Sequence, residues 1–95
     1  MKRHSIISKK VNGGAEFDFV LDYSLILTDR REFDLFEEKD IYSVLILQLE
    51  NGIATDYDFI YDIARDEKKA VEILNLFVYN KVMPQNAREV FADYV

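Results

Sequence analysis

The sequence predicts an α+β fold in which an antiparallel four-stranded β-meander is followed by two C-terminal helices packed on one face. Over residues 53–63, apolar and polar side chains alternate with the period of two of a strand. Over residues 70–81, apolar side chains instead recur every three or four positions, as on an amphipathic helix. The change of period between these runs divides a single domain, residues 1–95, into a sheet half (1–64) and a two-helix half (65–95).

The first two strands are predicted from a turn signal and an alternating run. Asn12, Gly13 and Gly14 tolerate the positive φ of a tight turn, so residues 5–11 are expected to pair with the chain from Ala15 onward. One row of the second run is wholly apolar and aromatic, and we expect it to face the core: Phe17, Phe19, Leu21, Tyr23, Leu25 and Leu27. The alternate row is mostly polar and is expected to face solvent.

The third strand, residues 41–50, is apolar on both faces, which favours a central position covered on both sides. Asn51 and Gly52 mark a second tight turn into the fourth strand, residues 53–63. Between the second and third strands, residues 28–40 are dense in charge and are expected to form a loop.

The helical half starts at Asp66, because its carboxylate can accept the free N–H groups of a first turn and the neighbouring Glu67 suits the positive end of the helix dipole. This helix is expected to reach about Asn80. Pro84 fits the first turn of a second helix, where its missing N–H costs little. The second helix has an apolar stripe made of Ala87, Val90, Phe91 and Tyr94.

Composition and charge restrict the class of protein. The chain has a net charge of −6 and no cysteine, so it has no disulfide, thiol nucleophile or thiolate metal site. No run is apolar enough for a signal peptide or a membrane span, and we expect a soluble cytoplasmic protein with no membrane partner. Residues 15–65 hold thirteen acids against four bases, a balance that repels phosphate and predicts no nucleic-acid partner. Only residues 1–14 are basic, with four bases and no acid.

The residues do not form a pattern typical of catalysis or of metal binding. His4 is the only histidine, and no partner that could tune it lies beside it in the sequence. Asn12-Gly13-Gly14 lacks the Lys-Ser/Thr that follows a phosphate-binding loop. Arg88 is the only base of the second helix, whereas a DNA-recognition helix stands among several. We therefore predict no catalytic, cofactor-binding or metal-binding residue.

Two groups of residues are candidates for binding another molecule. Six apolar residues would form an exposed patch if they share the sheet face opposite the helices: Tyr42, Val44, Ile46, Val20, Ile26 and Ile60. The competing interpretation is that residues 28–40 cover them. Five acids are expected on polar faces of the strands, as a solvated surface or as an acidic binding face: Asp18, Asp22, Asp56, Asp58 and Asp62.

Several positions match the pattern of a known family. Tyr42, Ser43 and Val44 fit an aromatic-small-aliphatic strand, although Ser43 stands where a glycine is expected. The end of the chain matches more closely, at Ile63, Asp66, Leu74, Phe77, Asn80, Lys81, Val82, Pro84, Val90 and Asp93. On these positions residues 42–95 resemble a small clostridial family catalogued as domain of unknown function 6514. The resemblance implies no activity, cofactor or catalytic residue.

The sequence therefore predicts a non-enzymatic interaction or regulatory module that binds itself, as a homodimer through its sheet, or another protein. The alternative is an acidic binder that occupies a basic protein partner by imitating the charge of a nucleic acid, because residues 15–65 are so acidic. A small enzyme is the third hypothesis, and it would need a pocket with convergent polar groups.

Overall fold

The computed structural model describes residues 2–12, 19–29 and 40–94 of the chain. Four strands form one antiparallel sheet in which each strand pairs with its neighbours in the sequence. In order across the sheet these strands are β1 (Lys2–Asn12), β2 (Val20–Asp29), β3 (Ile41–Glu50) and β4 (Ile53–Ala64). The predicted meander is confirmed, with β1 and β4 at its two edges.

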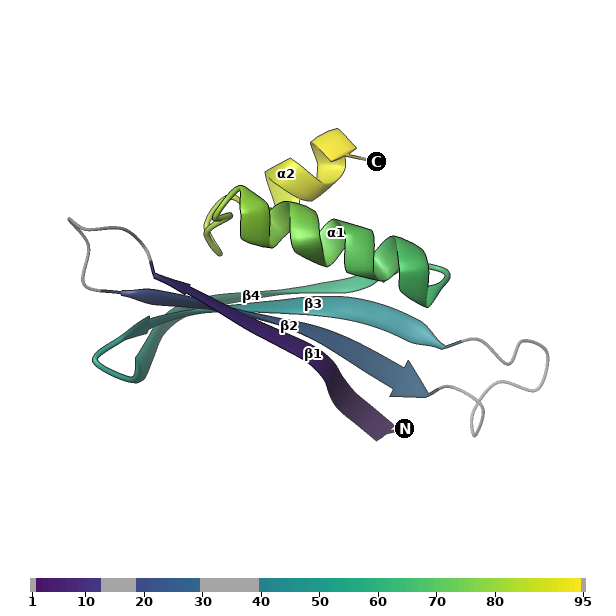
Figure 1. Ribbon diagram of the computed structural model, residues 1–95, viewed down its shortest axis with the longest axis horizontal. Helices are drawn as coiled ribbons and strands as arrows, with labels where there is room; N and C mark the ends of the chain where they lie inside the picture. The colour runs from purple at the N-terminus through teal and green to yellow at the C-terminus, as the bar shows by residue number, and fades with distance from the viewer. Residues whose placement is uncertain (1, 13–18, 30–39, 95) are drawn as a thin grey trace.

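Two helices follow the sheet and lie on the same side of it (Figure 1). The first, α1 (Glu67–Tyr79), packs across β2, β3 and β4. The second, α2 (Ala87–Tyr94), is tied to α1 by Lys69, whose Nζ donates a 2.9 Å hydrogen bond to the hydroxyl of Tyr94. The predicted α+β arrangement is therefore confirmed, and the two described helices cover one face of the sheet.

The core fills the space between α1 and the helix side of the sheet. Its fully buried side chains come from β2, β3, α1 and α2: Leu21, Tyr23, Leu25, Val44, Ile46, Ala70, Ile73, Leu74, Phe77 and Ala87. Burial of side chains this large stabilises the fold by about 2 kcal/mol each. The β2 row that the sequence assigned to the core is confirmed at Leu21, Tyr23 and Leu25, while Phe17 lies outside the described residues.

Local signals fix the turn after β3 and both ends of α1. Asn51 and Gly52 have φ values of 54° and 78°, as the two central residues of a type I′ turn require. Asp66 caps α1 by accepting a 2.8 Å hydrogen bond from the main-chain N–H of Lys69. At the other end, Lys81 has a φ of 50°, and the N–H of Val82 donates to the carbonyl of Phe77 in a Schellman motif.

The start of α2 differs from the prediction. Pro84 is buried in the connection before the helix rather than in its first turn. Asn86 takes the N-cap place, because its carbonyl accepts from the N–H of Val90 and its Oδ1 accepts from the N–H of Met83 at 2.9 Å. The proposed turn residues Gly13 and Gly14, and residues 30–39 of the expected loop, lie outside the described residues.

β4 carries a bulge near its C-terminal end. Val44 pairs with Ile60 but Tyr42 pairs with Ala64, so β4 holds two residues more than β3 between these pairs. Asp62 has a φ of 58° there, and its N–H donates to the hydroxyl of Ser43 at 3.1 Å. Because two added residues preserve the alternation, Ile60 before the bulge and Ala64 after it both lie on the helix side of the sheet.

Candidate functional site

The six residues of the predicted apolar patch lie on both faces of the sheet. Val44 and Ile46 are opposite Leu25 and Tyr23 of β2, and therefore share the core face with them. Val44, Ile46 and Ile60 are buried in the core, and Tyr42 packs against it. Val20 and Ile26 lie on the opposite face. The six residues therefore do not share one face, and the condition for the predicted patch is not met.

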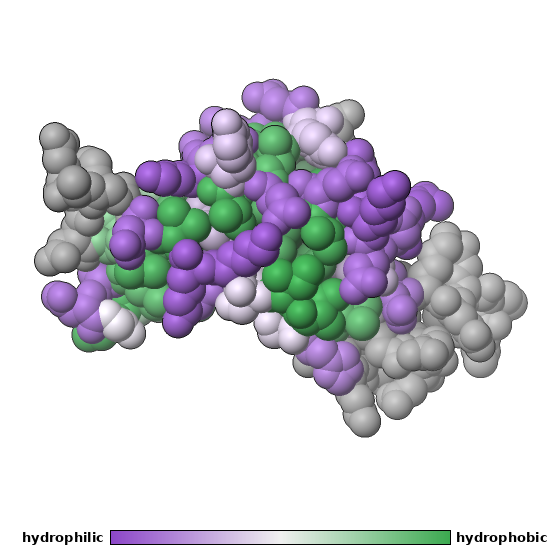
Figure 2. Space-filling model, in the orientation of Figure 1, coloured by the Kyte–Doolittle hydropathy of each residue, from purple (hydrophilic) through white to green (hydrophobic). Residues whose placement is uncertain are grey.

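The sheet face away from the helices, called the outer face below, has its own apolar row. Leu45 is paired with Phe59 and Leu47 with Tyr57 across β3 and β4. Tyr57 is 67% exposed and Tyr61 is 43% exposed, whereas the other members are half-buried. The apolar members of the outer face are Val20, Ile26, Leu45, Leu47, Leu49, Tyr57, Phe59 and Tyr61. Figure 2 shows that hydrophobic areas interrupt the hydrophilic surface over the sheet as well as beneath α1.

The outer face becomes polar toward β1. Ser8 and Asp22 lie on neighbouring strands there, and the Ser8 hydroxyl donates to Oδ1 of Asp22 at 3.1 Å. Lys10 is the direct cross-strand partner of Asp22 and is exposed. The outer face is thus aromatic and aliphatic over β3 and β4, and mixed in charge over β1 and β2.

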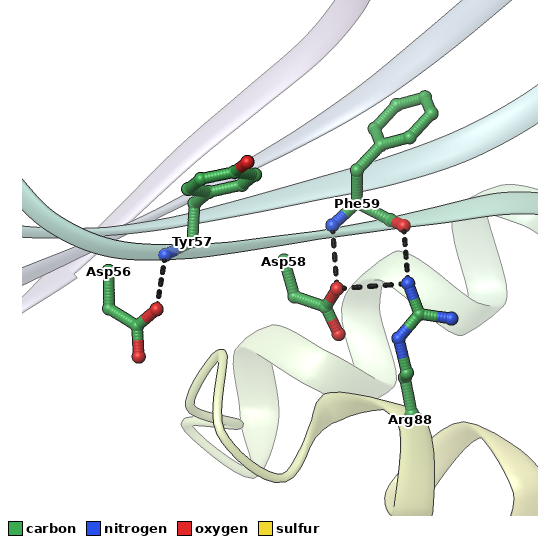
Figure 3. Close-up of polar contacts among 5 residues, drawn as sticks. All are labelled: Asp56, Tyr57, Asp58, Phe59 and Arg88. Atoms are coloured by element: carbon green, nitrogen blue, oxygen red, sulfur yellow. Dashed lines mark hydrogen bonds and ion pairs between the residues drawn. The ribbon is translucent and has the colours of Figure 1, made fainter.

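Two of the predicted acids lie along the outward edge of β4 and bond to its own main chain. Oδ1 of Asp56 accepts the N–H of Tyr57 at 2.8 Å, and Oδ1 of Asp58 accepts the N–H of Phe59 at 2.9 Å (Figure 3). Arg88 of α2 donates from Nη2 to Oδ1 of Asp58 and to the carbonyl oxygen of Phe59, both at 3.1 Å. The Asp58 side chain is 18% exposed and the Arg88 side chain is 70% exposed, so the pair is shielded on the β4 side and open to solvent on the α2 side.

The connection before α2 adds a second attachment to the same edge. Gln85 donates from Nε2 to Oδ2 of Asp56 and, at 3.0 Å, to Oε1 of Gln48 on β3. Gln85 just before α2 and Arg88 in its first turn therefore both reach β4. Asp56 and Asp58 therefore have a structural role, because their carboxylates accept hydrogen bonds from Gln85 and Arg88 and so hold the start of α2 against the sheet.

The five predicted acids do not form one binding face. Asp22 is on the outer face, whereas Asp56 and Asp58 belong to the row that faces the helices. Asp62 is exposed in the bulge, and Asp18 lies outside the described residues. The alternation of β4 had placed its acids together on a solvated face. No pattern in the sequence indicated that Gln85 and Arg88 would contact them, although Arg88 lies outside the apolar stripe of α2.

Two tyrosine hydroxyls of the sheet have raised pKa values. Burial raises the pKa of Tyr23 to about 12. Burial also raises the pKa of Tyr42, with a smaller contribution from the charge of Asp40. In the described ranges, no three His, Cys, Asp or Glu side chains are grouped so that they could hold a metal ion. None of the helices described is long and apolar enough to cross a membrane.

Comparison with known proteins places the chain in a family. Residues 2–95 match the model of a family of unknown function (DUF6514). No curated protein and no solved structure matches the chain significantly. The match extends the resemblance seen over residues 42–95 to β1 and β2, so all four strands and both helices fall within it. The chain therefore belongs to this family of unknown function.

Proposed function

We propose that the protein is a non-enzymatic interaction module that forms a homodimer through the outer face of its sheet. The observation that carries the proposal is the aromatic row of β4, in which Tyr57 and Tyr61 are exposed beside half-buried Phe59. Exposed tyrosines next to aliphatic side chains are typical of the central part of protein interfaces. Two sheets commonly pack through such faces at a separation of about 10 Å.

The size of the outer face suits such a contact. Strands about 4.8 Å apart with a rise of about 3.4 Å per residue give a four-stranded, ten-residue sheet a flat area of roughly 600 Å². Side-chain relief increases the accessible area, and a standard interface buries about 800 Å² on each partner. The apolar half over β3 and β4 would form the centre of the contact, and the polar half over β1 and β2 its rim.

A second copy of the chain is an electrostatically acceptable partner for this face. Lys10 and Asp22 give the rim one charge of each sign, so two copies related by a two-fold axis bring no single-sign surface together. The acidic-binder alternative has less support, because Asp58 is paired with Arg88 and Asp56 is bonded to Gln85 within the same molecule.

Sedimentation equilibrium of the whole chain and of two matched variants tests the dimer. Tyr57→Lys places a charge in the centre of the outer face and is expected to give a monomer. Tyr79→Lys makes the same change on α1, where the side chain is 86% exposed, and is expected to leave the dimer intact. A wild-type monomer at tens of micromolar, or equal behaviour of the two variants, would contradict the proposal.

A further inference from the structure

The two edges of the sheet differ in how their main-chain groups are occupied. Along β4, the N–H groups of Tyr57 and Phe59 bond to the carboxylates of the preceding residues, and the carbonyl of Phe59 accepts from Arg88 (Figure 3). These groups point away from β3 and are the ones that an added strand would use. An added strand would have to break these three bonds first.

Irregular backbone also limits the length of β4 over which a new strand could pair regularly. The register with β3 shifts between Gln48 and Leu49 at one end, and between Tyr42 and Val44 at the other. Bulges of this kind bend an edge away from the geometry that a new strand needs. Together with the occupied groups between them, these shifts close the β4 edge to strand addition.

The β1 edge has one register shift, between Ser5 and Ile7, and is regular beyond it. Its register with β2 is unbroken from the pair Ile7–Leu25 to the pair Asn12–Val20. Among the residues that the structure describes, none makes a hydrogen bond to the main chain of β1 outside its ladder with β2. A regular edge of six residues whose outward main-chain groups bond to no other described residue suits β-augmentation.

The positive charge of β1 favours an added strand that is acidic. Lys9 and Lys10 are exposed and point to opposite faces of the sheet, since neighbouring residues of a strand alternate. Lys9 Nζ is held on the helix side by Oδ1 of Asn75 at 2.6 Å, and Lys10 lies on the outer face. Like charges facing each other destabilise a strand pair and opposite charges stabilise it, so β1 is a poor partner for a second β1.

We propose that the edge of β1 binds an extended acidic segment of another protein, which joins the sheet as a fifth strand. Main-chain hydrogen bonds along residues 7–12 would supply the affinity, and the two lysines would select acidic side chains on both faces of the incoming strand. This surface is separate from the outer-face dimer, because it uses the edge of the sheet and not its face.

The test uses a capped peptide of about ten residues, rich in valine and threonine, with glutamates on both faces. It is titrated into ¹⁵N-labelled Tyr57→Lys protein, so that loss of the proposed dimer cannot affect the result. We expect a dissociation constant below about 1 mM, with the largest amide shifts and new exchange protection at residues 7–12. The same peptide with N-methylated amides is expected not to bind, since it cannot form the ladder.

Side-chain selection is tested with a charge reversal and a matched control. Lys10→Glu is expected to weaken binding at least threefold, because it turns an attraction into a repulsion. Lys68→Glu makes the same change on the exposed side of α1 and is expected to leave the affinity unchanged. The proposal is overturned if the peptide shifts β4 amides instead, if N-methylation makes no difference, if an oligonucleotide of equal charge binds as well, or if no peptide binds.

Discussion

The hydroxyl of Tyr23, in the middle of β2, donates a 2.9 Å hydrogen bond to the main-chain carbonyl oxygen of Val82, in the connection between the two helices. Both residues are buried in the core. The bond satisfies the only polar atom of the tyrosine side chain and a carbonyl just beyond the end of α1. It therefore fixes where the chain leaves α1 relative to the centre of the sheet.

Removal of this hydroxyl should destabilise the fold. Tyr23→Phe leaves the Val82 carbonyl buried without its partner, and we expect the free energy of unfolding to fall by about 1–2 kcal/mol. Tyr79→Phe removes a hydroxyl from an exposed side chain and should change stability by less than about 0.5 kcal/mol. Urea denaturation of both variants measures the difference, and equal midpoints would show that the bond contributes nothing.

The raised pKa of Tyr23 predicts a loss of stability at alkaline pH. Its pKa is about 12 in the folded protein against 10 for an ordinary tyrosine, so folding favours the neutral hydroxyl. This contribution is complete below pH 10 and is lost as the pH rises from 10 to 12, at up to about 1.4 kcal/mol per unit. Denaturation series from pH 8 to 12 should show a steeper decline for the wild type than for Tyr23→Phe. Parallel curves would refute the assignment.

The end of α1 contains a correctable strain. Lys81 adopts a φ of 50°, a region that costs a residue with a side chain about 1 kcal/mol relative to glycine. We expect Lys81→Gly to raise the free energy of unfolding by up to about 1 kcal/mol, because the Schellman bonds are kept. Lys81→Ala is the control, since it removes the charge and keeps the strain. If the free energy of unfolding rises equally in both variants, the gain comes from removal of the lysine charge and not from relief of strain.

Self-association is expected when the side-chain bonds that occupy the β4 edge are removed. Asp58→Ala with Arg88→Ala frees the N–H and carbonyl of Phe59 from these two side chains. We expect light scattering of this double variant to grow with time and concentration, while stability falls by only about 1 kcal/mol. Arg65→Ala, which removes an exposed base beyond the end of β4, should not scatter more than the wild type. If the double variant scatters no more light than the wild type, the Asp58 and Arg88 side chains do not prevent strand addition at the β4 edge.

Elements with a local cause were predictable from the sequence. The turn at Asn51 and Gly52 depends on which residues tolerate positive φ, and the start of α1 depends on one carboxylate at Asp66. Both are set by neighbours in the chain, so a short window of sequence contains the whole cause. The same holds for the β2 core row, where alternation over an unbroken strand was enough.

The faces of β3 and β4 needed information from distant residues. β3 is apolar on both sides, so only its pairing with Tyr23 and Leu25 reveals which side meets the helices. In β4 the alternation alone does not show which row meets the helices, and the pairing of Asp58 with Ile46 settles it. The bonds of Arg88 to β4 likewise join positions about thirty residues apart, which no local pattern encodes.

The aromatic row of β4 is independent of the residues with which that strand builds the core. Tyr57, Phe59 and Tyr61 present their rings on the outer face, whereas Ile60, Ile63 and Ala64 of the same strand pack in the core. A substitution in the aromatic row therefore leaves the packing beneath α1 unchanged. The specificity of the outer face can be redesigned residue by residue without rebuilding the fold.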